Sequence, residues 1–313
     1  MNILFHAYPH NARAWIQCLQ QQLPQAHIRL WRPGDHGAAD YLITRHPPAD
    51  LLIDRPDLQA IFNLGAGADS LLQALRDPIA TLPQSIPLVR LEDAGMASQM
   101  VDYVVHAVLH QYRQFEDYAN YRRLRQWHVL SAPRKKNFQV GILGLGILGS
   151  AVAVALDSLG FEVRGWSRRA KTEARIPYEY GTQGLPQFLK GLNCLINLLP
   201  LTPETENILN RALFQQLAPG AYLINVARGA HLVEADLLEA IQTGTLSGAR
   251  LDVMRLEPLP ADHPFWQEPR ISITPHISAV NLLEPSMKQI AQKIRALCRG
   301  ESISGVIDRH SSY

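Results

Sequence analysis

The chain has 313 residues, of which 47% are hydrophobic and 19% are charged, with 20 glycines and 21 prolines. This is the composition of a folded globular protein, and it excludes disordered, collagen-like and coiled-coil chains. Thirty Lys and Arg residues against 28 Asp and Glu residues give a net charge of +2, which argues against a protein that coats nucleic acid or an anionic membrane. At about 100–200 residues per domain, the length predicts two domains.

The N-terminus and the cysteines indicate the compartment. Residues 1–6 lack the basic and long apolar regions of a signal peptide. Cys18, Cys194 and Cys298 are too few and too scattered for a disulfide framework or a Cys-rich metal site. We therefore expect a cytoplasmic protein. The uncharged run Val140–Leu156 approaches the length of a membrane span, but its four glycines favour a strand, a tight turn and a helix.

Short apolar runs alternate with mixed helical stretches over the first 95 residues. The pattern predicts a helix over Arg13–Leu23. Strands that alternate with helices indicate a parallel sheet with crossover connections. The predicted strands, each bounded by Pro, Gly or Asp, are Asn2–Phe5, His27–Trp31, Tyr41–Ile43, Ala60–Leu64 and Leu88–Leu91.

Apolar residues at helical spacing mark the segment from 96 to 126. Met100, Val104, Val108 and Tyr112 predict a long helix, with room for a break. Residues 118–156 contain no acidic side chain. The basic residues that cluster there are Arg122, Arg123, Arg125, Arg134, Lys135 and Lys136. A solvated connector or a subunit-contact arm is the favoured interpretation, and a phosphate-binding arm is the alternative.

From residue 138 onward the alternation of strands and helices is stronger. Helices are predicted over 147–159, 204–217 and 234–243, and a last helix over about Asn281–Arg299. Six strands with intervening helices resemble a doubly wound dinucleotide-binding sheet. The predicted strands are Phe138–Leu143, Glu162–Trp166, Cys194–Leu198, Ala221–Asn225, Gly248–Asp252 and Ile271–Thr274.

Gly144, Gly146 and Gly149 form the pattern G-x-G-x-x-G directly after the apolar strand Gln139–Leu143. A bare match is weak, but a strand before it and an apolar helix after it are the context that a dinucleotide loop requires. The first glycine allows a tight turn, the second lets the backbone approach a pyrophosphate, and the third lets the helix pack closely. The helix N-terminus would then face the phosphates. The alternative is a glycine-rich turn in a buried strand–helix unit.

The next strand indicates which dinucleotide binds. An NAD site usually ends this strand with Asp or Glu, about 20 residues after the loop. Here Ser167, Arg168 and Arg169 follow the strand, and no carboxylate stands at its end. Arginine suits a 2′-phosphate through charge-assisted hydrogen bonds. We therefore predict NADP as cofactor, with NADPH preferred over NADH. The alternative is that both arginines are solvated surface residues.

Three polar residues of the second half follow strand ends, where open parallel sheets have their ligand crevice: Arg228, Glu257 and His276. An arginine can hold a substrate carboxylate through two parallel hydrogen bonds. A histidine can transfer a proton near neutral pH, and a glutamate can orient its ring and favour the protonated form. Each residue alone is unremarkable. Together, after a dinucleotide loop, they predict a dehydrogenase site.

These motifs resemble those of the D-isomer-specific 2-hydroxyacid dehydrogenase family in order and approximate spacing. They are Gly144–Gly149, Asn225–Gly229, Leu251–Pro260 and Thr274–His276. The resemblance covers nearly the whole chain. Further stretches that are most similar to a subgroup acting on glyoxylate and hydroxypyruvate are Asn63–Ser70, Arg90–Met96, Trp166–Arg168 and Ile196–Pro200.

The family resemblance implies an α/β fold of two Rossmann-like, doubly wound parallel-sheet domains. The substrate domain would be discontinuous and would comprise residues 1–98 and 283–313. The dinucleotide-binding domain would comprise residues 99–282. In the resembling family, an arm such as the basic segment packs two cofactor domains together, so we expect a twofold homodimer.

The resemblance also implies roles for individual residues. Arg228 would bind the carboxylate and carbonyl of a 2-oxo acid, with His276 as the acid and Glu257 as its partner. Backbone N–H groups of Ala66 and Gly67 would assist at the carboxylate. The pair Ser167 and Arg168 would select NADPH. Further cofactor contacts would come from Ile147, Leu148, Leu199, Pro200, Ala227 and Asp252, the last of them near the nicotinamide.

The expected reaction is NADPH-dependent reduction of a small 2-oxo acid: glyoxylate to glycolate, and hydroxypyruvate to D-glycerate. Arg45 follows the strand Tyr41–Ile43, where an apolar or aromatic residue is more usual for this subgroup. A solvated turn arginine is the favoured interpretation of Arg45, and contact with the substrate is the alternative.

Two other functions are alternatives to the reduction of a small 2-oxo acid. Some proteins of the same resemblance act as dinucleotide-sensing corepressors, and a fold alone does not decide function. A phosphoglycerate-type dehydrogenase lacks support because the NAD acid is missing. We expect no metal, since His6 and His10, or His106 and His110, lie four apart without a third ligand. We expect no nucleic-acid or membrane partner.

Overall fold

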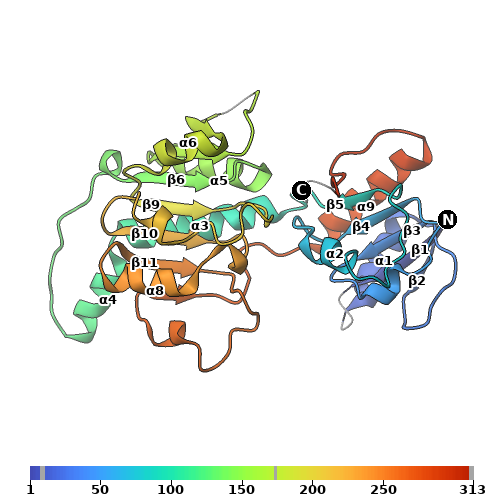
Figure 1. Cartoon of the computed structure of the whole chain (residues 1–313), viewed down its shortest axis with the longest axis horizontal. Coiled ribbons are helices and arrows are strands. Elements are labelled where there is room, and N and C mark those ends of the chain that lie inside the picture. The colour runs from blue at the N-terminus through green and yellow to red at the C-terminus, as the bar shows by residue number, and fades with distance from the viewer. Residues whose placement is uncertain (8–10, 173–174, 310–313) are drawn as a thin grey trace. The chain divides into compact units, whose positions relative to one another are not determined.

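The structure is a computed structural model that describes residues 1–7, 11–172 and 175–309. The chain divides into two compact units, Met1–Met96 with Asn281–Tyr313, and Ala97–Val280 (Figure 1). Each unit contains one parallel sheet flanked by helices, which confirms the predicted α/β class. The assignment of the units as substrate domain and cofactor domain stays a prediction.

The first unit contains a five-stranded parallel sheet in the order β2-β1-β3-β4-β5. This is one of the two common orders of doubly wound sheets. Both faces of the sheet are covered, so its inner strands are short and mostly apolar runs. The strands are β1 (Asn2–His6), β2 (His27–Leu30), β3 (Tyr41–Thr44), β4 (Ala60–Asn63) and β5 (Leu88–Arg90). All five predicted strands are confirmed, with ends shifted by one residue.

In the described residues, four helical segments flank this sheet. The N-terminal helix α1 (Ala12–Gln22) packs against the C-terminal helix α9 (Leu283–Cys298), so segments from both ends of the sequence build this unit. The short helices η1 (Ala49–Leu52) and α2 (Asp69–Ala74) were not predicted. They add leucines to a core that the strands also line, made of Leu4, Leu42, Leu51, Leu52, Ile61, Leu71 and Leu72 among others.

The second unit contains a seven-stranded parallel sheet in the order β12-β11-β10-β9-β6-β7-β8. All six predicted strands are confirmed, but β8 was missed because its sequence, Tyr-Glu-Tyr, has no apolar run and lies at the sheet edge. The strands are β6 (Gln139–Leu143), β7 (Glu162–Ser167), β8 (Tyr178–Tyr180), β9 (Cys194–Asn197), β10 (Ala221–Asn225), β11 (Leu246–Leu251) and β12 (Ile271–Ile273).

Helices cover both faces of this sheet (Figure 1). One core contains side chains of α3 (Met96–Tyr112) and α5 (Ile147–Ser158), and the other contains those of α6 (Gly181–Leu189) and α8 (Glu234–Gln242). The remaining helical segments are α4 (Phe115–Arg123), α7 (Arg211–Phe214), η2 (Lys135–Asn137), η3 (Gly229–His231) and η4 (Pro264–Gln267).

Left-handed residues interrupt two of the predicted helices. The long helix after residue 96 does break, because Gln114 adopts a left-handed conformation with φ of 55° between α3 and α4. The prediction of a helix over 204–217 is wrong. Asn207 is left-handed with φ of 57°, and the Asn210 side chain accepts from Leu213 N–H to start a helix of only four residues.

The uncharged run Val140–Leu156 divides into most of β6, a glycine turn and most of α5. No helix among the described residues combines the length and apolarity that crossing a bilayer requires. The run is therefore a buried strand–turn–helix, as its glycines indicated.

Candidate active site

The candidate site lies where the order of the seven-stranded sheet reverses. Strand β6 has β7 on one side and β9 on the other, so the connections from β6 and β9 leave toward opposite faces. Ligands of open α/β sheets bind in the crevice outside the carboxyl ends of the strands at such a point. The predicted residues of this unit lie at or after the ends of β6, β7, β9, β10, β11 and β12.

The glycine loop between β6 and α5 packs tightly on its surroundings. Gly144 has φ of 98°, and a Cβ there would lie 2.7 Å from the Leu198 carbonyl oxygen. A Cβ on Gly149 would lie 1.9 Å from the Gly144 carbonyl oxygen. Only glycine fits these two positions. The first N–H groups of α5, from Ile147 onward, have no intrahelical acceptor and carry the positive end of the helix dipole. These features fit a dinucleotide pyrophosphate.

The end of β7 carries positive charge. Arg168 and Arg169 are exposed, and the Ser167 hydroxyl donates to the Arg169 carbonyl oxygen at 2.7 Å. A hydrogen bond from Thr202 and the nearby Arg168 guanidinium hold the pKa of Glu204 below its usual range. The Arg168 charge, after β7, therefore acts on Glu204, which follows β9.

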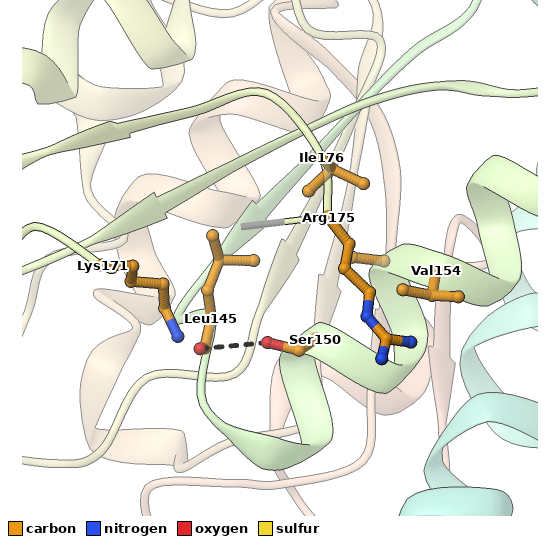
Figure 2. Close-up of a pocket in the computed structure, with 7 residues that line it drawn as sticks. Leu145, Ser150, Val154, Lys171, Arg175 and Ile176 are labelled. Atoms are coloured by element: carbon orange, nitrogen blue, oxygen red, sulfur yellow. Dashed lines mark hydrogen bonds between the residues drawn. The ribbon is translucent and has the colours of Figure 1, made fainter. Parts of the chain in front are cut away.

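Beside the glycine loop lies a cavity of about 160 Å³ that sequence reasoning missed. Figure 2 shows the Lys171 amino group on the Leu145 side and the Arg175 guanidinium on the Val154 side. The Ser150 hydroxyl donates to the Leu145 carbonyl oxygen at 3.1 Å. No described residue forms an ion pair with Lys171 or Arg175. Two more positive charges thus lie next to the start of α5.

A buried hydrogen-bond network supports the segments after β9 and β10. Asn197 Nδ2 donates to Asn225 Oδ1 at 3.0 Å and lies 2.9 Å from His231 Nδ1. His231 Nδ1 is therefore an acceptor, and Nε2 carries the proton that is donated to the Pro200 carbonyl oxygen at 3.2 Å. Sequence reasoning missed Asn197 and His231. The only signal in the sequence was that two neighbouring buried strands each end in an asparagine.

This network positions the predicted cofactor and substrate residues. Asn197 Oδ1 accepts from Leu199 N–H at 3.2 Å, and Asn225 Oδ1 accepts from Ala227 N–H at 3.3 Å. Asn225 Nδ2 donates to the Arg228 carbonyl oxygen at 3.1 Å. The Arg228 side chain, which is half-buried, donates to the Ala227 carbonyl oxygen at 2.6 Å. The backbone on both sides of the crevice is thus held by side chains from the strand ends.

Gly229 explains why a glycine follows Arg228. A Cβ on Gly229 would lie 1.8 Å from the Met254 carbonyl carbon, so the backbone after β10 touches the backbone after β11. Met254 N–H in turn donates to Glu257 Oε1 at 3.0 Å. The close approach therefore brings the Arg228 segment onto the loop that holds Glu257.

Glu257 and His276, which were predicted to act as an acid and its partner, are in direct contact. His276 Nδ1 lies 2.9 Å from Glu257 Oε2, and both side chains are about 40% exposed, with values of 39% and 40%. A carboxylate only accepts hydrogen bonds, so Nδ1 carries a proton and Nε2 is the ring nitrogen left for chemistry. Because Met254 holds the other carboxylate oxygen, Glu257 fixes the orientation of the ring.

Asp252 is fully buried beneath the loop that carries His276. Its Oδ1 accepts from the Thr274 hydroxyl at 2.6 Å and from Ile277 N–H at 2.9 Å, and its Oδ2 accepts from Ser278 N–H at 2.8 Å. The contacts that the structure gives Asp252 therefore hold this loop. Its predicted proximity to the nicotinamide stays a prediction.

The other predicted residues belong to the first unit. Asn63 Nδ2 donates to the Gly67 carbonyl oxygen at 2.7 Å and ties down the loop after β4 that contains Ala66. Arg45 is half-buried, and its Nε donates to His46 Nε2 at 3.3 Å. The substrate roles of Ala66, Gly67 and Arg45 stay predictions.

In the part of the chain that the structure describes, histidines and acids are not gathered into a metal site. Within residues 1–7, 11–172 and 175–309, no three side chains of His, Cys, Asp or Glu are placed to hold an ion. His10 lies outside the described residues. The rings of His106 and His110 lie 5.8 Å apart, and His110 approaches Glu116 at 3.7 Å.

Known proteins are similar to this chain in sequence and in fold. A family model described as D-isomer specific 2-hydroxyacid dehydrogenase, NAD binding domain, matches residues 105–278. The glyoxylate/hydroxypyruvate reductase A of Serratia proteamaculans (strain 568) is 49% identical over 308 residues, which cover 98% of both chains. That of Klebsiella pneumoniae (strain 342) is 45% identical over the full length of both.

Two solved structures extend the comparison. An NADPH-dependent glyoxylate/hydroxypyruvate reductase from Sinorhizobium meliloti, in complex with NADP and sulfate, is similar with a TM-score of 0.91, 31% identity and full coverage of both chains. A D-isomer specific 2-hydroxyacid dehydrogenase from Xanthobacter autotrophicus Py2, in complex with NADPH and MES, has a TM-score of 0.92 and 34% identity, and covers 100% of this chain and 99% of its own.

Proposed function

The chain belongs to the D-isomer-specific 2-hydroxyacid dehydrogenase family, and from this premise we propose that it uses NADPH to reduce glyoxylate to glycolate and hydroxypyruvate to D-glycerate. Membership makes it an NAD(P)-dependent 2-hydroxyacid dehydrogenase. The observation that carries the proposal is the His276–Glu257 pair, 2.9 Å apart, in the same unit as a glycine loop that fits a dinucleotide.

His276 supplies the proton for the carbonyl oxygen of the 2-oxo acid. Its Nδ1 is held by Glu257, so the proton leaves from Nε2 when the ring is protonated. The Glu257 carboxylate stabilises the imidazolium before transfer and keeps the ring oriented after it. In the reverse direction the neutral ring would accept the proton from the hydroxyl group of the 2-hydroxy acid.

Arg228 anchors the substrate carboxylate. Its guanidinium presents donors in a planar fork that matches a carboxylate, and its backbone is fixed by Asn225 on one side and by the contact of Gly229 with Met254 on the other. A carboxylate held at this point places the adjacent carbonyl group at a defined position. The positive charge of Arg228 also stabilises the negative charge that develops on the carbonyl oxygen during hydride transfer.

The residues present fit NADPH. Gly144, Gly146, Ile147, Leu148 and Gly149 would hold the pyrophosphate, and Ser167, Arg168 and Arg169 would hold the 2′-phosphate. Lys171 and Arg175, at the cavity in Figure 2, add positive charge beside the start of α5 and would attract the cofactor phosphates. When bound, the dihydronicotinamide supplies the hydride for the carbonyl carbon. Leu199, Pro200, Ala227 and Asp252 are proposed as further cofactor contacts.

Small substrates are proposed because the curated relatives at 45–49% identity are named for glyoxylate and hydroxypyruvate. A two-carbon or three-carbon 2-oxo acid offers a carboxylate for Arg228 and a carbonyl oxygen for His276. The motifs that contain Arg228 and His276 provide no dedicated site for a second anionic group of the substrate. Bulky aromatic 2-oxo acids should therefore be poorer substrates.

The test is the rate of NADPH consumption with glyoxylate, hydroxypyruvate, oxaloacetate and phenylpyruvate, for the wild-type protein and Arg45→Ala. We expect glyoxylate and hydroxypyruvate to have the highest kcat/KM, with D-glycerate formed from hydroxypyruvate. A panel led by phenylpyruvate would refute the small-substrate proposal. NADPH binding without turnover of any 2-oxo acid would instead indicate a dinucleotide sensor. Unchanged ratios in Arg45→Ala would exclude Arg45 from substrate selection.

A further inference from the structure

A chain of hydrogen bonds begins on helix α3 and ends beside His276. The Tyr103 hydroxyl lies 2.5 Å from the Thr274 hydroxyl, 171 residues later in the sequence. Thr274 Oγ1 lies 2.6 Å from Asp252 Oδ1. Tyr103 is therefore joined, through one hydroxyl group, to the carboxylate that holds the His276 loop.

The number of available protons fixes which group donates in each of these hydrogen bonds. The Asp252 carboxylate accepts from two backbone N–H groups and only accepts hydrogen bonds when ionised. The Thr274 hydroxyl has one proton, which it donates to Asp252, so the Tyr103 hydroxyl must donate to Thr274. Burial and the Asp252 charge raise the pKa of Tyr103, against the lowering effect of the Thr274 hydrogen bond and of Arg250. The phenol thus keeps the proton that it donates.

His276 depends on this loop for its position. Its φ is 56°, a left-handed conformation that residues other than glycine rarely adopt and that persists only where the surroundings determine it. His276 N–H donates to the Asp252 carbonyl oxygen at 2.8 Å and to the Thr274 carbonyl oxygen at 3.1 Å. Asp252 thus accepts hydrogen bonds from residues 274–278 with its backbone oxygen and with both carboxylate oxygens.

We propose that Tyr103 is a positioning residue for the His276–Glu257 pair, acting through Thr274 and Asp252. The Tyr103 hydroxyl fixes the rotamer of Thr274, because a hydroxyl that both accepts and donates has one orientation that satisfies both partners. The Thr274 side chain in turn fixes one carboxylate oxygen of Asp252. The kinetic consequence rests on the proposed reductase function, whereas the structural consequence does not.

The kinetic test compares Tyr103→Phe with Tyr112→Phe. Both variants remove a hydroxyl donor from helix α3, but the Tyr112 hydroxyl donates to the Pro133 carbonyl oxygen at 2.7 Å and not toward the site. We expect Tyr103→Phe to lower kcat about fivefold, the size expected from one lost hydrogen bond, with little change in KM or in the dissociation constant of NADPH. Tyr112→Phe should retain kcat.

A double-mutant cycle tests the route through Thr274. Thr274→Val should lower kcat further than Tyr103→Phe, and adding Tyr103→Phe to it should cause no further loss. Thr274→Ser retains the hydroxyl and should restore most of kcat. Losses that multiply in the double variant would overturn the proposal, because Tyr103 would then act by another route.

A third experiment, by NMR, needs no substrate. The ring signals of His276 in an NMR spectrum of the whole protein can be assigned by their absence in His276→Asn. Tyr103→Phe should shift or broaden them, and Tyr112→Phe should not. Unchanged His276 signals in Tyr103→Phe would refute the positioning role. A wild-type protein that reduces no 2-oxo acid would refute the proposed function, while the His276 signals would still decide the role of Tyr103.

Discussion

His276 and Glu257 show how an exposed pair can still be well oriented. Each side chain is about 40% exposed, so their attraction alone would be weak. The order comes from elsewhere: Met254 N–H holds Glu257, and Asp252 holds the backbone of His276. The pair is therefore suited to exchange protons with a ligand while retaining one geometry.

The acid role of His276 has a direct test. His276→Asn keeps a side chain of similar polarity but removes the transferable proton. We expect kcat to fall by about 10² or more, because general acid catalysis contributes about 10²–10⁴-fold. NADPH binding, followed by fluorescence titration, should stay close to wild type. Near-normal turnover in this variant would show that His276 is not the acid.

Cofactor choice is expected to depend on the residues after β7. We predict that Ser167→Asp combined with Arg168→Ala reverses the preference for NADPH over NADH. The new carboxylate would accept from a ribose hydroxyl and repel a 2′-phosphate. The change in the kcat/KM ratio should be about tenfold or more, because one charge-assisted hydrogen bond contributes about 1.5–3 kcal/mol.

The control for cofactor choice is Arg164→Ala, in which an arginine earlier in β7 is removed. Arg164 lies within β7 and not at its end, and its guanidinium donates to the Lys190 carbonyl oxygen. The NADPH preference of this variant should be unchanged. Equal efficiency of the wild-type protein with both cofactors would mean that Arg168 and Arg169 do not read the 2′-phosphate.

At the scale of elements, helix α9 anchors the segment that follows β5. Lys293 is only 8% exposed, and its ammonium donates to Glu92 Oε2 at 3.0 Å, the Arg90 carbonyl oxygen at 3.2 Å and the Ser304 carbonyl oxygen at 2.9 Å. Gln289 donates to the Glu92 carbonyl oxygen at 2.6 Å and accepts from Glu92 N–H at 2.8 Å. The C-terminal helix thus fixes the chain just before α3.

Lys293→Met should destabilise the first unit by about 1–3 kcal/mol at neutral pH, because it removes the cation beside a partly buried carboxylate and the donor to two carbonyl groups. Burial raises the pKa of Glu92, but hydrogen bonds from Ser304 and Lys293 outweigh it, so the pKa lies below its usual value. The stabilisation is therefore complete above the unfolded pKa of Glu and is lost as the pH falls through the folded pKa.

Urea unfolding at pH 7 and at about pH 3 would measure this dependence. The difference between wild type and Lys293→Met should be largest at pH 7 and should shrink in acid. Lys288→Met, at an exposed position of the same helix, should be close to neutral at both pH values. A penalty in Lys293→Met that grows in acid would contradict the assigned role of Glu92.

At the scale of the whole molecule, the segment around α4 exposes an unusual amount of apolar surface. Trp127 is 100% exposed, and Val129 and Leu124 are 78% and 64% exposed. Trp127 and Val129 line a cavity of about 480 Å³ together with Tyr118 and Tyr121. Large exposed apolar groups that adjoin each other are typical of a protein–protein interface.

We predict a twofold homodimer that buries this segment, since such dimers are the commonest symmetric oligomers. Light scattering at micromolar concentration should give about twice the chain mass of 35.0 kDa. Trp127→Glu should shift the protein toward the monomer, because a charge would be buried in an apolar contact. Ile79→Glu, which charges an exposed apolar residue of the first unit, should leave the mass unchanged. A monomeric wild-type protein would exclude the dimer.

Much of the fold could be predicted from local patterns. Most strands contain a short apolar run, so eleven of the twelve strands in the described residues were recognisable, and β8, with the sequence Tyr-Glu-Tyr, was not. A predicted helix fails at Asn207, where a left-handed residue interrupts a segment with helical spacing. Such a turn depends on contacts made after folding, here between Asn207 N–H and the Ala230 carbonyl oxygen.

The sequence by itself determined the types and order of the chemical groups: the glycine loop, the arginines after β7, and Arg228, Glu257 and His276 after successive strands. Only the tertiary structure decided how these groups are held. Gly229 against Met254, Asn197 beside His231, and Tyr103 bonded to Thr274 join residues that lie far apart in the chain. The physical reason is that a local pattern specifies which groups a strand end presents. The order and register of the strands specify which of those groups meet.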